Sequence, residues 1–150
     1  MQQIGFKQVN RWKHYSRYLN SLDTHDSTVQ DAPLLILELS SFGDGKPLLP
    51  SLKTLRVRPN WTGVVRGASA LMHILGPSLK NLHLEFDKMP LPEWVDTYLG
   101  AVVKKCIGLA RLSIRYSGVP EISYILNDSA HHIAELTSLT TLSLPHVGLR

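Results

Sequence analysis

The sequence predicts an α/β fold made of repeated strand–helix units, and three observations lead to this prediction. A short motif, small-Leu-x-x-Leu-x-apolar, occurs four times, with its first leucine at Leu52, Leu79, Leu109 and Leu139. The copies are spaced by 27, 30 and 30 residues. Within a copy, apolar and polar residues alternate as in a half-buried strand, and between copies apolar residues recur at helical spacing.

This period is typical of a leucine-rich-repeat solenoid, in which each unit buries its apolar side against its neighbours. We therefore expect one array over residues 1–150, with a parallel sheet on its concave side and helices on its convex side. Strand–helix–strand connections between parallel strands are right-handed in nearly all proteins, so the array is expected to be right-handed.

The motif also places the strands. In the first clear copy, Leu55 and Val57 alternate with Thr54 and Arg56, so the apolar pair is expected to face the core and the polar pair to face outward. A weaker copy over residues 18–23 adds a strand before the four clear ones. The five strands are expected near residues 18–24, 52–58, 80–86, 110–116 and 140–145.

Two helices are expected before the third strand. The first covers residues 31–42, with Asp31 as its N-cap. The apolar run 34–39 leaves a buried strand as the alternative there. The second covers residues 61–75, where apolar residues share one helical face, and Pro77 follows its end.

Two further helices, over 92–107 and 120–136, each begin with Pro-Glu and carry one apolar face. On the outer face of the last, Asp128 and His132 lie four residues apart and are expected to pair weakly. A basic, aromatic helix over 12–18 is expected to cover the first end of the array. No closing helix follows the last strand, so we expect the natural protein to continue beyond it or to end bare.

Composition limits the classes of function. The 150 residues, 43% of them hydrophobic, suffice for one domain with a continuous core. The net charge is +4, but no run of five like charges occurs, so nucleic acid is not the expected partner. No apolar stretch is long enough for a membrane span. A single cysteine, Cys106, cannot form an internal disulfide, which favours a cytoplasmic or nuclear location.

Motifs for catalysis, cofactors or metals are not found. The dipeptide Gly45-Lys46 lacks the upstream glycine and the following Ser or Thr of a phosphate-binding loop. The adjacent His131 and His132 are expected to face different sides of their helix, with no second ligand at metal-binding spacing. Cys106 lies on an apolar helical face, as a buried thiol does. We therefore expect no enzyme activity, no cofactor and no metal.

The concave face is the candidate site. Adjacent strands lie about 4.8 Å apart, so the outward residues of the strands form one polar surface. Four arginines are expected to bracket Glu85, and arginine suits recognition of carboxylate or phosphate. The alternative is a set of solvated outward positions with no partner. The expected partner-binding residues are Arg56, Arg58, Asn81, His83, Glu85, Arg111, Ser113, Arg115 and Ser143.

Three segments resemble the repeat region of fungal F-box proteins with leucine-rich repeats: 47–55, 75–82 and 137–144. Residues 12–22 resemble the piece that leads into the first repeat of those proteins. The resemblance implies the target-recognition part of a substrate receptor in a Skp–cullin–F-box ubiquitin ligase. The residues before the first strand do not resemble an F-box, so a ligase adaptor is expected as a partner only if an F-box lies upstream.

The sequence thus predicts a protein–protein interaction module that binds a protein target on its concave face. A free-standing repeat scaffold or decoy without a ligase connection remains an alternative. Binding of RNA to the basic surface is a second alternative, and a steep fall of affinity with salt would distinguish it.

Overall fold

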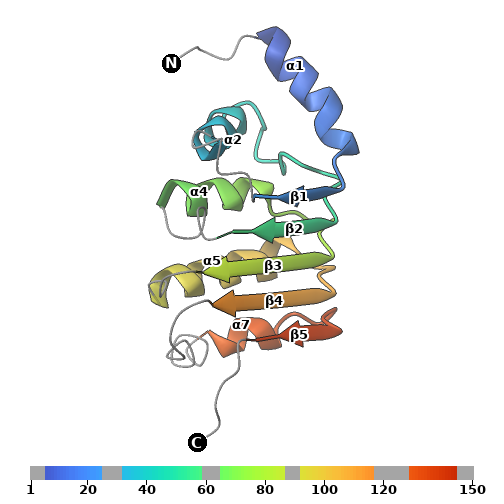
Figure 1. Cartoon of the computed structure of the whole chain (residues 1–150). Helices are drawn as coiled ribbons and strands as arrows, with labels where there is room; N and C mark the ends of the chain where they lie inside the picture. Colours follow the sequence, from blue (N-terminus) through green and yellow to red (C-terminus); the bar gives the residue numbers. More distant parts are fainter. Residues whose placement is uncertain (1–5, 25–31, 59–64, 87–91, 117–128, 145–150) are drawn as a thin grey trace, which may run out of the picture.

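The computed structural model describes residues 6–24, 32–58, 65–86, 92–116 and 129–144. These residues build a five-stranded parallel sheet whose strands lie side by side in chain order (Figure 1). Each strand lies within its expected range. The strands are β1 (Ser21–Asp23), β2 (Thr54–Val57), β3 (Asn81–Phe86), β4 (Arg111–Tyr116) and β5 (Thr141–Ser143). The α/β class with alternating helices and parallel strands is confirmed.

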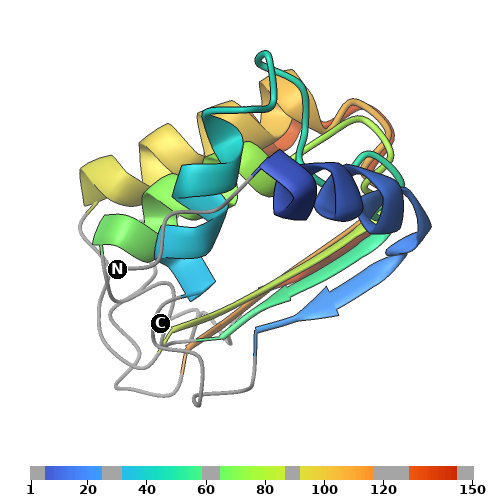
Figure 2. The same ribbon diagram turned by 90° about the horizontal axis from the view of Figure 1, so that it is seen from above.

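Helices alternate with the strands and lie on one face of the sheet (Figure 2). Residues 32–40 form a helix, which excludes the alternative of a buried strand there. Asp31, residues 61–64 and most of the helix expected over 120–136 lie outside the described residues. The described helices are α1 (Phe6–Tyr15), the 3₁₀ turn η1 (Ser16–Tyr18), α2 (Ala32–Ser40), α4 (Val65–Ile74), α5 (Pro92–Lys105) and α7 (Ala130–Ala134).

The pairing register aligns the repeats as the motif predicts. Leu22 of the weak copy pairs with Leu55, and the same column continues through Leu82, Leu112 and Leu142. Because side chains alternate along a strand, this alignment places the same set of residues on the same face throughout the sheet.

The core lies between the sheet and the helices. The inward residues of β2 and β3, with Leu112 and Ile114 of β4, are almost fully buried and pack against α4 and α5 through residues such as Leu71 and Tyr98. The core is thinner at the last unit: α7 has no buried residue, and Leu142 of β5 is 43% exposed. Hydrophobic stabilisation follows buried area, so α7 and β5 contribute less to it than the described helices and strands of the middle units.

The small first residue of the motif has a structural reason. The hydroxyls of Ser78 and Ser138 donate to the carbonyls of Pro50 and Ile107, in the preceding unit, at 2.6 and 3.0 Å. In the third copy Gly108 occupies this position, and a Cβ there would require only the flexible Lys80 side chain to move. The motif serine therefore links neighbouring turns.

Tyr98 gives a first test of the core. It is fully buried and stacks on Trp94, yet no described group accepts its hydroxyl proton. A buried hydroxyl without a partner lowers stability, so Tyr98→Phe is expected to raise the free energy of unfolding by about 1 kcal/mol. Urea unfolding measures this, with the exposed Tyr15→Phe as a control that should change little. A loss of stability in Tyr98→Phe would show that the hydroxyl has a partner.

The helix α1 lies at the β1 end of the sheet (Figure 1), and its Trp12 packs against the core.

Among the described residues, no helix combines the length and the apolar character that a membrane span requires.

Candidate functional site

The candidate site is the face of the sheet opposite the helices, which we call the open face (Figure 2). The strand register places the outward residues in rows across this face. Thr54, Asn81, Arg111 and Thr141 form one row, and Arg56, His83, Ser113 and Ser143 form the next. Glu85 pairs in register with Arg115, and Arg58 follows the end of β2. All nine expected binding residues thus lie at neighbouring positions.

A chain of ion pairs crosses the first three strands. Both Nε and Nη2 of Arg56 donate to Oε1 of Glu85, at 3.0 and 2.6 Å. Arg58 donates from Nη1 to Oε2 of Glu85 at 3.0 Å, and from Nε and Nη2 to the carboxylate of Asp23 at 3.0 and 3.1 Å. The two positive and two negative charges of this network cancel.

Glu85 is the centre of this network. Its side chain is only 16% exposed, and both carboxylate oxygens accept from arginines. Burial raises the pKa of Glu85, but the hydrogen bonds and charges of Arg56 and Arg58 outweigh burial and hold the pKa below its ordinary value of 4.5. Glu85 is therefore ionised at neutral pH and holds the two β2 arginines in place.

Arginines flank Glu85 from both neighbouring strands, as expected, but only those on the β2 side pair with it. Among the described residues, no ion pair forms with Arg111 or Arg115, and both are exposed. The reason is geometric: Arg56 and Arg58 already supply three donors to the carboxylate oxygens from the neighbouring strand β2. The β4 arginines consequently keep donors that a ligand can use.

A small hollow lies between these two groups of arginines. It has a volume of about 120 Å³, and it is lined by Arg56, His83, Leu84, Glu85, Ser113 and Arg115. Both oxygens of the Glu85 carboxylate accept from Arg56 and Arg58, so its charge is paired with theirs. Burial lowers the pKa of His83 below its ordinary value of 6.5, and the charges of Arg56 and Arg115 lower it further. The imidazole is therefore neutral at pH 7 and can donate one hydrogen bond without adding charge.

The chemistry of the hollow suits one anionic group. Guanidinium groups donate paired hydrogen bonds to carboxylate and phosphate oxygens, and Arg115 makes no described ion pair. Pockets for drug-sized molecules usually measure about 300–1,000 Å³, so this hollow is too small for a whole cofactor. A single acidic side chain of a larger partner fits its size and its charge.

Cys106 has the properties expected of a structural thiol. It is fully buried directly after the end of α5, and burial raises its pKa to about 11. A thiol with such a pKa stays protonated at neutral pH and is a poor nucleophile.

One constellation was missed by sequence reasoning. His131 and His132 were expected to diverge, but their ring centroids lie only 3.9 Å apart. His132 pairs with Asp96 of α5 at 3.1 Å, whereas its expected partner, Asp128, lies outside the described residues. The contact depends on the packing of α7 against α5, which a helical-wheel argument on one helix does not contain.

Comparisons with known proteins add no relative. No protein-family model matches this sequence, and searches of curated proteins and of solved structures find no significant match. They assign the chain to no family.

Proposed function

We propose that this chain is a leucine-rich-repeat module that binds an acidic segment of a partner protein on its open face. In this proposal the five strand–helix units are successive turns of a short right-handed solenoid, and the open face is its concave side. The observation that carries the proposal is the hollow beside Arg115, a cation that no described carboxylate neutralises.

A protein partner is favoured over RNA by two observations. The ion-pair network neutralises Arg56 and Arg58, so only Arg111 and Arg115 remain available on the described strands of this face. No outward residue of the described strands is Phe, Tyr or Trp, although single-stranded RNA is usually bound by stacking on such side chains. A few fixed donors suit a carboxylate better than a phosphate backbone.

The likeness of the repeats to fungal F-box proteins supports a more specific role, the recognition of targets for ubiquitination. The ligase adaptor belongs to this role only if an F-box lies upstream of the repeats. A free-standing scaffold that binds the same acidic segment is the second candidate. Both candidates use the same binding site, but only the ligase role requires a ligase adaptor as a second partner.

His83 provides a direct reporter for the site. A carboxylate bound in the hollow lies close to the imidazole and favours its protonated form, so binding should raise the pKa of His83. We expect an acetylated tetraglutamate peptide to move the His83 midpoint upward in an NMR titration. The midpoint of His73, which lies on α4 on the helical side of the sheet (Figure 2), should not move.

Arg115→Glu tests the same site by charge reversal. It is expected to weaken binding of the peptide at least about tenfold, equivalent to about 1.4 kcal/mol, because the unpaired donor is replaced by a repelling carboxylate. Arg11→Glu makes the same charge change at an exposed position of α1 and should leave affinity near that of the parent. Equal losses in both variants would mean that only net charge matters. Tighter binding of polyuridylate with a steep salt dependence would favour the RNA alternative instead.

A further inference from the structure

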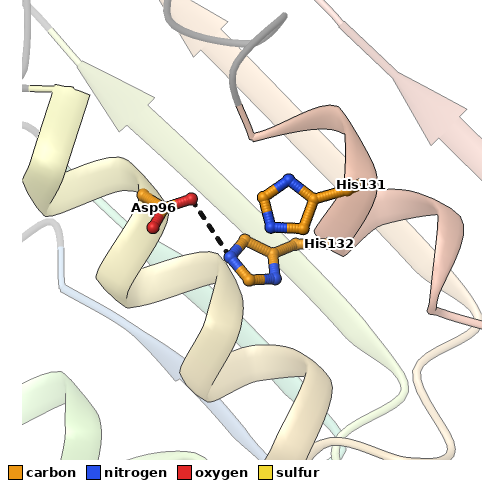
Figure 3. Close-up of side chains that lie close together, drawn as sticks. All are labelled: Asp96, His131 and His132. Atoms are coloured by element: carbon orange, nitrogen blue, oxygen red, sulfur yellow. Dashed lines mark ion pairs between the residues drawn. The ribbon is translucent and has the colours of Figure 1, made fainter.

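Three potential metal ligands meet between α5 and α7. Asp96 projects from α5, and His131 and His132 project from the start of α7 toward it (Figure 3). One ligand atom from each of the three side chains lies within 4.8 Å of the other two. One of these separations, from His132 Nε2 to Asp96 Oδ1, is 3.1 Å.

The His132 ring of this cluster packs against the backbone of α5 at Gly100. A Cβ at Gly100 would lie 3.2 Å from Cε1 of His132, so the imidazole rests directly on the glycine. Asp96 and Gly100 are four residues apart and therefore share one face of α5. Glycine lowers helix stability in a helix interior, and here it allows the His132 ring to approach the Asp96 carboxylate.

The donor set is that of a transition-metal site. Two imidazole nitrogens and one carboxylate oxygen are common ligands of zinc, with bonds of about 2.0–2.2 Å. Tetrahedral geometry then separates the ligand atoms by about 3.3 Å. The His132–Asp96 separation of 3.1 Å is already close to this value, and His131 is exposed, so its ring has room to turn toward the other two ligand atoms.

We propose that Asp96, His131 and His132 bind a zinc ion, with solvent in the fourth position. The ion joins α7 to α5 and thereby holds the last strand–helix unit against the rest of the fold. This unit is where such a link has most effect, because α7 has no buried residue and Leu142 of β5 is 43% exposed. A ligand that binds only the folded state stabilises it in proportion to its occupancy.

Binding can be measured on the full chain after treatment with a chelator. Titration calorimetry with Zn²⁺ is expected to give one ion per chain, and Co²⁺ is expected to give the visible absorption of a four-coordinate site. Asp96→Ala, His131→Ala and His132→Ala should each weaken Zn²⁺ binding at least about tenfold. His73→Ala removes an exposed histidine of α4 and should bind Zn²⁺ like the parent. Circular dichroism checks that each variant is folded.

A second readout follows the structural role. Zn²⁺ is expected to slow amide hydrogen exchange in α7 and β5 at least fivefold in the parent and not in His131→Ala. Gly100→Ala, which displaces the His132 ring, should weaken binding as well.

The proposal is overturned if the parent takes up no Zn²⁺ at 1 mM, or if the three ligand variants bind as the parent does. An equal loss in His73→Ala would likewise mean adventitious binding to surface histidines. The zinc site is separate from the open face. Arg115→Glu should therefore bind Zn²⁺ as the parent does, whether or not the open face binds an acidic peptide.

Discussion

Leu82→Ala is expected to lower the free energy of unfolding by about 2–5 kcal/mol, the usual loss for removing a fully buried leucine side chain. Leu82 lies in the central strand β3, has no exposed surface, and pairs in register between Leu55 and Leu112. Its truncation leaves a cavity where the sheet meets the helices. Urea unfolding followed by circular dichroism measures the loss through the shift of the midpoint.

Leu142→Ala is the matched control. Leu142 occupies the same position of the motif in β5, but 43% of its surface is exposed. The expected loss is about 1 kcal/mol or less, because little apolar area leaves the core and no closed cavity forms. Similar losses in the two variants would show that the core is as deep beneath β5 as beneath β3. A loss below about 0.5 kcal/mol in Leu82→Ala would contradict the register itself.

The strand positions and their register could be predicted because they depend on a pattern repeated along the chain. Each copy of the motif carries its own alternation, so Leu55, Leu82 and Leu112 are placed on the same face without knowledge of the other elements. The segment 32–40 was harder, since a run of apolar residues fits both a buried helix and a buried strand.

The pairing of charges on the open face could be predicted only in part. Alternation places the arginines and Glu85 on one surface, but long side chains reach either neighbouring strand. Arg58 consequently bridges Glu85 and Asp23, 27 and 35 residues away in sequence, whereas Arg115, in register with Glu85, forms no described ion pair. Which arginine pairs with which carboxylate depends on the directions of long side chains across three strands. The alternation of residues along one strand does not specify those directions.

The cluster of Asp96, His131 and His132 lay further beyond sequence reasoning. Two consecutive helical residues point about 100° apart on an ideal wheel, which predicts divergence. Their convergence requires the first turn of the short helix α7 and the close approach of α5. Gly100, a glycine inside a helix, was the one local signal that another group comes near.

Glu85→Ala is expected to lower the free energy of unfolding by about 2–3 kcal/mol, between the losses typical of exposed and of buried ion pairs. The side chain is 16% exposed and accepts three hydrogen bonds from Arg56 and Arg58, so its removal leaves two guanidinium groups facing each other without their shared anion. Asp23→Ala removes the other carboxylate of the same network. Because Asp23 is 41% exposed, that loss should stay below about 1 kcal/mol.

The contribution of Glu85 should also depend on pH in a defined direction. Its pKa is lowered on folding from 4.5, so the folded protein holds this proton less strongly than the unfolded chain does. The stabilisation is therefore fully present above about pH 5 and is lost as the pH falls through the lowered folded pKa. Between pH 7 and pH 3 the parent should lose more stability than Glu85→Gln, which has no carboxylate to titrate, and the difference between them should shrink toward low pH. Parallel stability curves over this range would show that the arginines of β2 do not stabilise the ionised form of Glu85.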